Sequence, residues 1–406
     1  MMGPGLTADL CLKCNICTAS CPVAAVTDLF AGPKAVGPQA ERFRHPALPS
    51  PDASVTWCSG CGTCSRVCPH GVEVAEINIQ AKAKLASEHG IPLRDHLLAR
   101  PDLLGKMGGP IAPLANSVLA WSPVRWLLEK TVGITRHGPL PPFASRPLRS
   151  RLHRLLVDRP PEQGISNTVV YFHGCSANYF EPSLGELAVR ILELLGYKVV
   201  LPPQGCCGLP LQSNGLFDAA RRYGRFNISS LAPFAQKGIP IVGSSTSCTL
   251  ALKHDYRAIL GMKGEEVEMV AHQVFDLFEF LVLRHADKVR ELARRPVRMR
   301  ALYHPPCQLK SHGIGTPAWA ILKSIPELEV ALSESECCGI AGTYGMKAEK
   351  ASVALAVGQS LFTQARESGA QVVISDSETC RWWIAKHTGL AALHPIEILA
   401  RSLEGV

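Results

Sequence analysis

Motifs that bind nucleotides are absent from this sequence. No G-x-G-x-x-G follows a strand-like run, no G-x-x-x-x-G-K-[ST] occurs, and Gly339, Gly342 and Gly345 have the wrong spacing for a dinucleotide. No pair of carboxylates and no nucleophile beside a base stands out either. We therefore expect neither a flavin nor a nucleotide on this chain, and hydride chemistry on a substrate would need a flavin held by another subunit.

Aromatic residues are scarce, at 6% of 406 residues, and no nucleic-acid-binding motif accompanies the net charge of +8. We therefore expect no nucleic-acid partner, and an anionic membrane surface or an acidic redox partner explains the basic charge at least as well. The remaining composition, with 47% hydrophobic and 19% charged residues, is that of a folded chain. The length predicts about two to four domains.

A long uninterrupted apolar run is also missing. Residues Met107–Val124 carry no charge, but glycines and prolines break any continuous helix there, and a membrane span needs about 20 mostly apolar residues. The stretch Met1–Asp9 has neither the charged segment nor the apolar core of a signal peptide. We expect neither a transmembrane helix nor a signal peptide.

Cysteine, in contrast, is abundant, with 16 residues. The pattern C-x2-C-x2-C-x3-C-P occurs twice, which is the spacing of bacterial two-cluster ferredoxins, where each run gives its fourth thiolate to the other [4Fe-4S] cluster. A C-x2-C pair alone often binds zinc, but the doubled order with both prolines argues against zinc and against disulfides. We expect a ferredoxin-like domain with two [4Fe-4S] clusters over residues 1–95. Its predicted ligands are Cys11, Cys14, Cys17 and Cys68 for one cluster and Cys58, Cys61, Cys64 and Cys21 for the other.

Two further segments belong to this domain. Between the cysteine runs, glycine-proline pairs in Leu29–Arg44 predict an extended, turn-rich insertion rather than a helix, which would cover one cluster or meet a partner. After the second run, Val74–Glu88 lacks internal glycine and proline and predicts a helix that ends at Gly90.

Residues 96–165 form a predicted linker that is rich in proline and arginine. Within it, Trp121 and Trp126 lie among the basic residues Arg125 and Lys130. Tryptophans beside basic residues are typical of an anchor that lies on an anionic membrane surface. In the alternative, the tryptophans pack internally and the many arginines form a solvated or partner-facing stretch.

The rest of the chain repeats itself. Cys175 and Cys206 are 31 positions apart, and their counterparts Cys307 and Cys337 are 30 apart. Strand-like and helical runs alternate in both units, which predicts two α/β modules in tandem, over residues 166–290 and 296–406, each with a short parallel sheet. The predicted strands are Thr168–Phe172, Lys198–Leu201, Pro240–Gly243, Arg300–Tyr303, Leu328–Leu332 and Gln371–Ser375. The predicted helices are Leu184–Leu195, Asp218–Leu231 and Ala348–Glu367.

Each module contains its own set of candidate metal ligands. Adjacent cysteines can serve one centre only from a loop, and Gly208 and Gly339 give such a loop its backbone freedom. Because the carboxyl ends of parallel strands meet at one edge of a sheet, we expect the thiolates to converge there. An iron-sulfur cluster and a zinc ion both fit such a set. The candidates are Cys175, Cys206, Cys207 and Cys248 in the first module and Cys307, Cys337, Cys338 and Cys380 in the second.

Two histidines, His173 and His304, precede the first cysteine of each module, and we expect hydrogen-bonded core residues rather than ligands. Thiolates that bind iron must stay reduced. This predicts a cytosolic protein or one that is peripheral to the cytoplasmic face of the membrane.

With these motifs, the chain resembles the iron-sulfur subunit family of anaerobic glycerol-3-phosphate dehydrogenases, within the wider family of heterodisulfide-reductase-type CCG-domain proteins. The resemblance implies an iron-sulfur electron-transfer protein that takes electrons from flavin-containing dehydrogenase subunits and passes them to the membrane quinone in anaerobic respiration. It rests on the segments CLKCNICTASCPV, GPKAVGPQAERFR, FHGCSANY, CCGLPL, SSTSCTLAL, ECCGIAGTYG, SETCRWW and HPIEILA.

The sequence leaves rival functions open. Paired CCG motifs also occur in iron-sulfur subunits of glycolate and lactate oxidases and in heterodisulfide reductases, and a scaffold with structural zinc in its modules has the same cysteines. Relatives often end a module with C-x-x-C, whereas this chain has Ser245 and Ser377 in place of the first cysteine. This departure argues against a five-thiolate, non-cubane cluster and favours a cubane, or zinc in one module.

Overall fold

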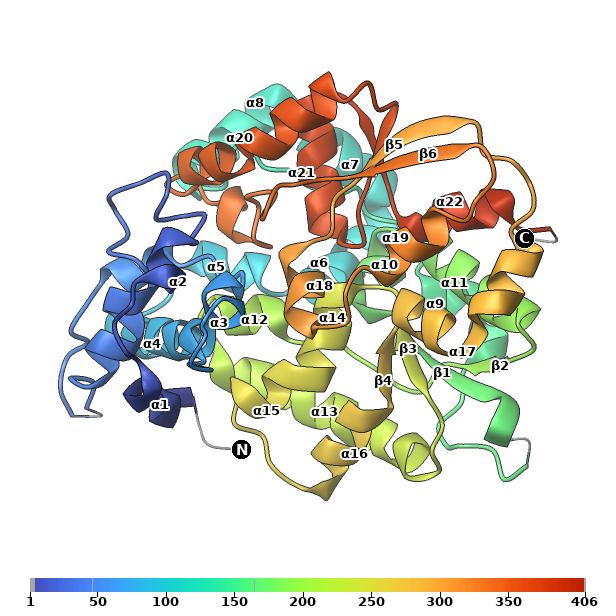
Figure 1. Cartoon of the computed structure of the whole chain (residues 1–406), viewed down its shortest axis with the longest axis horizontal. Coiled ribbons are helices and arrows are strands. Elements are labelled where there is room, and N and C mark those ends of the chain that lie inside the picture. Colours follow the sequence, from blue (N-terminus) through green and yellow to red (C-terminus); the bar gives the residue numbers. More distant parts are fainter. Residues whose placement is uncertain (1–3, 46, 164, 405–406) are drawn as a thin grey trace.

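Two parallel sheets and a small helical N-terminal domain organise the chain in the computed structural model, which describes residues 4–45, 47–163 and 165–404 (Figure 1). The N-terminal domain lies at one side of both sheets, and its longest helix is α4 (Val74–His89). Its other elements are α1 (Pro4–Thr7), η1 (Ala8–Leu10), α2 (Ile16–Ala19), η2 (Ala35–Gln39), η3 (Ser54–Trp57), α3 (Thr63–Arg66) and α5 (Leu93–Leu98).

The first sheet has four parallel strands in the order β2-β1-β3-β4. Its central strand β1 (Thr168–Phe172) is buried along its whole length, as its run of β-branched and aromatic residues predicts for a strand covered on both faces. The other strands are β2 (Lys198–Val200), β3 (Ile241–Gly243) and β4 (Val274–Asp276). The helices of this module are α10 (Gly174–Tyr179), α11 (Pro182–Leu194), α12 (Leu209–Ser213), α13 (Phe217–Gln236), α14 (Thr246–Leu250), η7 (Ala251–Asp255), α15 (Tyr256–Ala258), α16 (Glu265–Gln273) and α17 (Leu277–Leu292).

The second sheet repeats this topology in the order β6-β5-β7-β8, again with parallel strands. The predicted fold class, a ferredoxin-like domain followed by two α/β modules, is therefore confirmed. The strands are β5 (Met299–Tyr303), β6 (Leu328–Leu332), β7 (Val372–Ile374) and β8 (Ala391–Leu393). The helices are α18 (Cys307–His312), α19 (Pro317–Leu322), η8 (Tyr344–Met346), α20 (Ala351–Glu367), α21 (Glu378–Thr388) and α22 (Pro395–Ser402).

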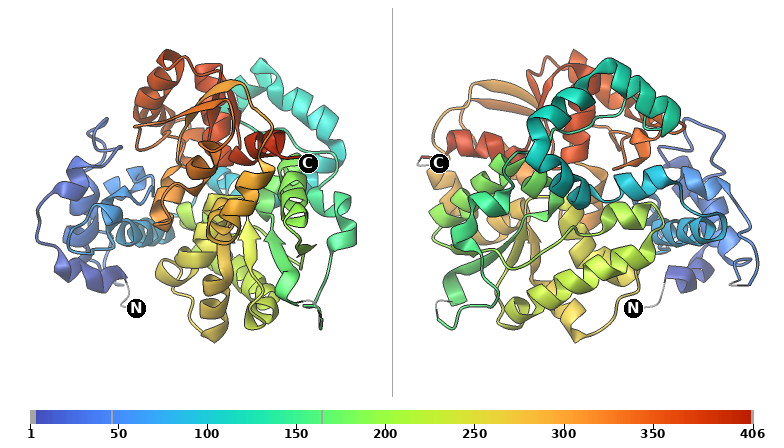
Figure 2. Two further views of the ribbon diagram at one scale, coloured as in Figure 1. Left: turned by 45° about the vertical axis from the view of Figure 1, so that its right-hand side comes forward. Right: turned by 180° about the vertical axis from the view of Figure 1, so that it is seen from behind.

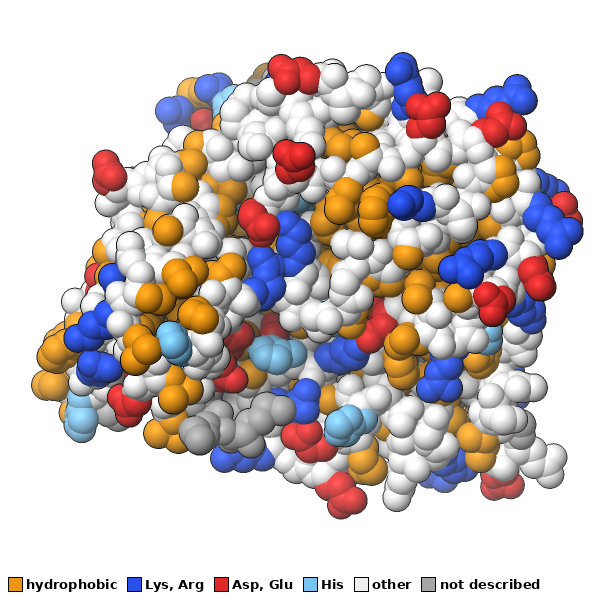
Figure 3. All heavy atoms as spheres, in the orientation of Figure 1, with side chains coloured by type: hydrophobic (Ala, Val, Ile, Leu, Met, Phe, Trp, Pro, Cys, Tyr) orange, Lys and Arg blue, Asp and Glu red, His pale blue; other side chains and the backbone are white. Residues whose placement is uncertain are grey.

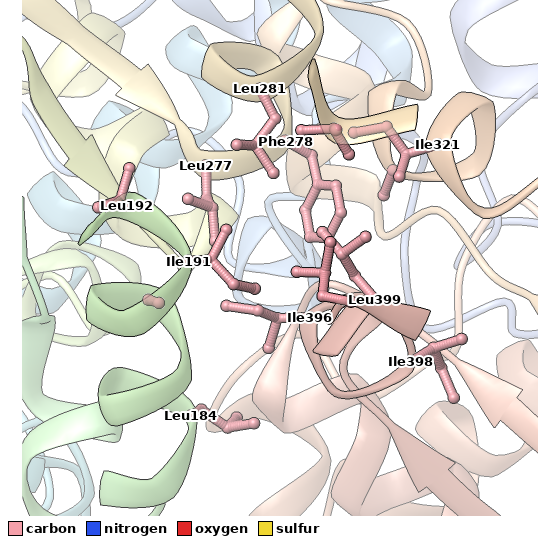
Figure 4. Close-up of a cluster of buried hydrophobic side chains, with 14 of the residues drawn as sticks. Leu184, Ile191, Leu192, Leu277, Phe278, Leu281, Ile321, Ile396, Ile398 and Leu399 are labelled. Carbon is pink, nitrogen blue, oxygen red and sulfur yellow. The ribbon is translucent and has the colours of Figure 1, made fainter. Parts of the chain in front are cut away.

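The two modules share one hydrophobic core. Ile191 of α11 and Phe278 of α17 come from the first module, and Ile321 of α19 and Leu399 of α22 come from the second (Figure 4). Phe278 and Leu399 are at most 1% exposed. Burying such side chains contributes about 1.5–3 kcal/mol each, so this core fixes the modules against each other.

A chain of short helices connects the N-terminal domain to the first module. Seen from behind, the segment that contains α7 and α8 lies on the outside of the molecule (Figure 2). Glycines and prolines interrupt the helices, as predicted, and no helix among the described residues has the length and apolar character of a membrane span. The elements are α6 (Pro101–Gly108), η4 (Gly109–Ile111), α7 (Ala112–Ala120), α8 (Ser122–Thr131), α9 (Leu148–Arg151), η5 (His153–Leu155) and η6 (Ile165–Asn167).

One segment differs from its prediction. The insertion Leu29–Arg44 was expected to be non-helical, but it contains the helical segment η2, with a kink at Gly37 and Pro38. A Cβ at Gly37 would lie 2.6 Å from Oδ1 of Asn78, so the glycine allows this segment to pack directly on α4. The contact with α4 stabilises a helical turn that the glycine-proline pairs alone disfavour.

Candidate iron-sulfur centres

The structure brings together each of the two crossed sets of cysteines in the N-terminal domain. One small cavity is lined by Cys11, Cys14, Cys17 and Cys68, which we name the first ferredoxin set. A second is lined by Cys21, Cys58, Cys61 and Cys64, which we name the second ferredoxin set. The insertion lies between them, because Phe30 and Pro33 line the second cavity and Lys34 lines the first.

Both cysteine runs follow the same backbone path. The third and fifth residues of each run have positive φ, at 62° and 72° for Lys13 and Asn15 and at 69° and 80° for Gly60 and Gly62. Left-handed residues turn a chain sharply, which lets three successive cysteines face one cavity. A single helical turn within each run contains the third cysteine, Cys17 in α2 and Cys64 in α3, and the fourth cysteine comes after this turn and faces the other set.

The two ferredoxin sets differ in exposure. Cys14 of the first set is exposed, whereas Cys58, Cys61 and Cys64 of the second set are all buried. Burial raises the pKa of Cys21 to about 12. Buried thiols of this kind become thiolates when a positively charged iron core compensates the charge, so the donor set fits a [4Fe-4S] cluster and metal binding would release protons.

The four candidate cysteines of each module also meet. They follow three neighbouring strands at the carboxyl edge of each sheet, as the sequence predicts: the adjacent pair lies in a loop and the other two lie in the helices that follow their strands. In the first module, the Cys175, Cys206, Cys207 and Cys248 side chains form a row of hydrogen-bonded sulfurs, which we name the first module set. In the second, Cys307, Cys337, Cys338 and Cys380 do the same, with 3.0 Å between Cys338 Sγ and Cys380 Sγ, and form the second module set.

One thiol in each module set is favoured as the anion. Hydrogen bonds from the thiols of Cys175 and Cys207 lower the pKa of Cys206 well below its usual value. The pKa of Cys337 is lowered in the same way by Cys307 and Cys338. Each module therefore presents one ready thiolate, surrounded by buried thiols that can ionise when a cation arrives.

The CCG loops obtain their shape from glycine. Gly339 has a φ of 94°, and a Cβ there would lie 2.0 Å from the carbonyl oxygen of Ala354 on α20. Gly208 takes the equivalent position with a φ of 84°. The loop can therefore pass close to the following helix only with glycine at this position, and this close approach places both preceding cysteines in the set.

The two histidines are buried and hydrogen-bonded through Nδ1, His173 to the carbonyl oxygen of Gly174 at 2.6 Å and His304 to Oγ of Ser333 at 2.9 Å. Burial lowers the pKa of His173 to about 3 and of His304 to about 4, so both are neutral. Among the described residues, Nε2 of neither ring has a hydrogen-bond partner. An iron-bound sulfur beside Cys337 would satisfy the orphaned nitrogen of His304, which supports a cluster in that module.

Within the described ranges, no group of three or more His, Cys, Asp or Glu side chains is arranged to hold a single metal ion. Ligation by the cysteines is therefore a proposal that rests on the donor sets, their burial and the orphaned nitrogen. Ser245 Oγ donates to the carboxylate of Glu378 at 3.2 Å, and Ser377 Oγ pairs with Thr379 Oγ1 at 3.3 Å. Each module set thus has four thiols and no fifth.

The second ferredoxin set touches the second module set. Cys61, Cys307 and Cys337 pack in one buried cluster. Ser311 Oγ on α18 spans the contact, with donor-acceptor distances of 3.4 Å to the carbonyl oxygen of Cys61 and 3.0 Å to that of Cys307. Nothing in the cysteine spacing indicated this contact, because it joins segments that are far apart in the sequence.

No sequence pattern indicated the two lysines near the second ferredoxin set. Lys82 Nζ donates to the carbonyl oxygen of Cys58 at 3.4 Å, and burial lowers its pKa to about 8. Lys350 Nζ lies 3.3 Å from the centre of the Trp57 ring, and burial lowers its pKa to about 7. Lysines are expected at the surface, and only the packing reveals that Lys350 is buried and that Lys82 is half-buried beside the cysteines.

A cavity of about 610 Å³ lies where the domains meet. Its wall includes Cys58 of the second ferredoxin set and thiols of both module sets. Its lining also includes apolar residues of the connecting helices, with Leu104, Leu119 and Leu128 among them.

Comparison with known protein families agrees with this arrangement. Residues 7–72 match the family model of a 4Fe-4S dicluster domain. Residues 169–253 and 301–385 each match the model of a cysteine-rich domain, CCG.

Three curated relatives extend the comparison. The matching subunit of anaerobic glycerol-3-phosphate dehydrogenase from Escherichia coli K12 is 35% identical over 97% of this chain and 98% of its own length. A subunit of dihydromethanophenazine:CoB–CoM heterodisulfide reductase from Methanosarcina barkeri is 26% identical over 92% of this chain and 87% of its own length. D-2-hydroxyglutarate dehydrogenase of Pseudomonas putida is 23% identical over 84% of this chain, but the match spans only 33% of that protein.

Proposed function

Because this chain belongs to the iron-sulfur subunit family of anaerobic glycerol-3-phosphate dehydrogenases, we propose that it carries electrons from a flavin-containing glycerol-3-phosphate dehydrogenase to the membrane quinone pool. The sixteen cysteines would hold two [4Fe-4S] clusters in the N-terminal domain and an iron-sulfur cluster in each module. Bound clusters supply one-electron transfer. We keep residues 1–95, 96–165, 166–290 and 296–406 as the proposed domain limits.

The observation that carries this proposal is the contact between the second ferredoxin set and the second module set. Cys61 packs against Cys307 and Cys337, so electrons that arrive in the N-terminal domain have a short buried path into the modules. The first ferredoxin set, with Cys14 exposed, is accessible to an electron donor. The proposed order is therefore donor, first ferredoxin set, second ferredoxin set, modules.

The surface around the first ferredoxin set suits a protein partner. Leu6, Leu10, Leu12 and Ile16 are 43–69% exposed beside this set. Figure 3 shows hydrophobic side chains interspersed with basic ones over the N-terminal domain. An apolar surface with charged neighbours is typical of a protein interface, and we propose that the flavin-containing partner docks there.

The connecting helices support contact with a membrane surface. Six apolar side chains follow one another at intervals of three or four residues along α6, η4 and α7, and each is 42–67% exposed. We name them the apolar stripe: Leu103, Met107, Ile111, Leu114, Val118 and Trp121. A helical stripe of this kind buries its apolar face in the head-group region, which holds a protein peripherally at the membrane.

The exposure of the tryptophans argues against their internal packing. Trp121 and Trp126 are 63% and 49% exposed, which supports a role at a surface. Arg125, however, is buried and donates to the carbonyl oxygens of Thr135 and Gly138, so its expected role beside a lipid head group is wrong. The guanidinium group of Arg125 instead stabilises the turn after α8 through these hydrogen bonds.

Reconstitution tests the proposed function. The chain, purified without oxygen and mixed with its flavin-containing partner, should show bleaching of its iron-sulfur absorbance when glycerol 3-phosphate is added, followed by quinone reduction. Absence of bleaching with an active partner would refute the proposal. Bleaching with glycolate or lactate but not glycerol 3-phosphate would favour the iron-sulfur protein of a 2-hydroxyacid oxidase.

Two more candidate functions have their own measurements. The match to a heterodisulfide reductase makes disulfide reduction a second candidate, tested by supplying a heterodisulfide to the pre-reduced chain. Iron and sulfide for only two cubane clusters together with stoichiometric zinc would favour modules with structural zinc.

A further inference from the structure

We propose that the cavity between the domains binds the quinone head group and is the place where the quinone is reduced. This inference rests on the proposed function and adds the location and the binding groups. The cavity has a volume of about 610 Å³, of which clusters held by the module thiols would fill a part, and pockets of roughly 300–1,000 Å³ are typical for small ligands.

The lining of the cavity combines two kinds of side chain. One group is sulfurs of both module sets, including Cys207, Cys248, Cys338 and Cys380. The other is apolar and consists of leucines and Phe143 from the connecting segment. This lining suits an apolar, redox-active molecule, because the molecule meets the thiols that would hold the electron carriers as well as hydrocarbon-like surroundings.

The apolar part of the cavity lining and the apolar stripe belong to the same segment. On α6, Leu103 is part of the stripe and Leu104 lines the cavity. On α7, Val118 and Leu119 form the same kind of pair. The same helices therefore bear both the apolar stripe and part of the cavity lining, so a lipid-soluble molecule that reaches the stripe is close to the cavity.

Two polar groups in the cavity lack partners among the described residues. These are Ser176 Oγ and Gln308 Oε1, which both line the cavity, and Ser176 is only 7% exposed. They occupy equivalent positions in the two modules, directly after Cys175 and Cys307. A quinone has two oxygens on opposite sides of its ring, so one oxygen can accept from Ser176 while the other, once protonated, donates to Gln308.

The reduction balances with groups that the proposal names. The two electrons would come from glycerol 3-phosphate through the flavin-containing partner, and clusters held by the module thiols would supply the one-electron transfer to the quinone. Two protons convert both C=O groups of the quinone into C–OH groups. His254 and Asp255 line the cavity with 3.1 Å between Nδ1 and Oδ1, and the His254 side chain is 39% exposed, so this pair connects the cavity to protons of the solvent.

Tryptophan substitutions on α7 test the site in the complete complex. Leu119→Trp fills the cavity, whereas Ala120→Trp, at the next residue, lies outside both the cavity wall and the apolar stripe. We expect Leu119→Trp to lower quinone reduction at least tenfold while glycerol 3-phosphate still bleaches the clusters. Ala120→Trp should keep both activities. Quinone reduction at the wild-type rate in Leu119→Trp would overturn the inference.

Failure of this site is distinguishable from failure of the proposed function. If glycerol 3-phosphate bleaches the wild-type clusters and quinone is reduced, but a photoreactive azidoquinone labels residues outside the cavity, the site is wrong and the function stands. If wild-type clusters stay oxidised, the function is wrong. Labelling uses the unmodified protein, so it decides the question even when Leu119→Trp folds poorly.

A milder variant tests the polar contact. Ser176→Ala removes one hydrogen bond to the bound quinone, and we expect the KM for quinone to rise about fivefold to tenfold with little change in kcat. Iron content and cluster absorbance should stay at the wild-type level. An unchanged KM would remove Ser176 from the binding site.

Discussion

The two cysteine runs have the same ligand spacing and the same backbone path but very different surroundings. The first run uses Lys13 and Asn15 where the second uses Gly60 and Gly62, although all four residues have positive φ. Glycine is therefore not required by the cysteine spacing itself. It is required in the second run because Gly62 packs on module two, where an added Cβ would lie 2.3 Å from Ser311 Oγ.

This difference separates two roles within one fold. The first ferredoxin set is at the surface and suits exchange with a partner protein. The second is buried against the modules and suits transfer inside the chain. Substitutions in each run and in the residues that contact it can test whether the two sets have these different roles.

The strongest effect is expected for Gly62→Ala. The new Cβ combines a left-handed φ, which costs about 1–2 kcal/mol, with a clash against Ser311. We expect electron transfer from the ferredoxin clusters to the modules to fall at least tenfold, measured by stopped-flow absorbance.

Two matched variants show whether the clash is responsible. Gly60 has a similar φ, but a Cβ there would meet only Ile79, at 3.6 Å. Gly60→Ala should therefore lose only the free energy of the left-handed backbone strain. Ser311→Ala added to Gly62→Ala leaves the nearest atom at 3.4 Å, and it should restore most of the transfer rate. If electron transfer in the double variant stays as slow as in Gly62→Ala, the contact with Ser311 is not the reason why residue 62 must be glycine.

The next effect concerns reduction potential. Lys82 lies beside the second ferredoxin set, and its positive charge stabilises the reduced cluster. Lys82→Met should lower the potential of that cluster by several tens of mV, since about 59 mV corresponds to a tenfold change in a one-electron equilibrium. Lys34→Met, beside the exposed first set, should produce a smaller shift because water screens its charge. Redox titration followed by electron paramagnetic resonance measures both, and equal shifts would contradict the expected effect of the different exposure of the two cysteine sets.

A pH series tests two buried carboxyl groups of the modules, Asp276 at the end of β4 and Asp376 after β7. Burial and the neighbouring Asp376 raise the pKa of Asp276 to about 8, and burial raises the pKa of Asp376 to about 6. The folded state then binds more protons than the unfolded state, in which Asp titrates near 3.9, so stability falls as the pH rises from about 4 to about 8. We expect Tm to decrease over this window and the decrease to be smaller in Asp276→Asn. An identical pH dependence in both proteins would rule out this carboxyl as its source.

The weakest effect is expected for Asn15→Gly. Asparagine tolerates the left-handed region and the first run has no neighbour like Ser311, so stability should change by less than about 0.5 kcal/mol. Thermal inactivation and iron content check this. A large loss would mean that the Asn15 side chain has a role of its own.

Much of the site was predictable because it depends on local rules. The spacing of the ferredoxin cysteines specifies which thiols meet, and strand ends specify where Cys206 and Cys337 lie. The fourth strand of each sheet was missed for physical reasons. β4 follows α16 directly without a turn signal, and Ala391 and Ala392 of β8 have little strand preference of their own.

The features that were not predictable depend on tertiary contacts. The helical turn in the insertion requires α4, and the buried position of Arg125 requires the carbonyl groups of the following turn. The contact of Ser311 with Cys61 and the cavity itself arise where domains meet, and no periodicity within one segment encodes them.

The decisive measurement is metal and sulfide analysis of the anaerobically purified chain, combined with electron paramagnetic resonance. An electron path through both ferredoxin sets and the modules predicts more iron than the about eight atoms of two cubane clusters, together with a magnetic interaction between the second ferredoxin cluster and its neighbour in module two. A preparation without labile sulfide, or one with about eight iron atoms and stoichiometric zinc, would contradict it.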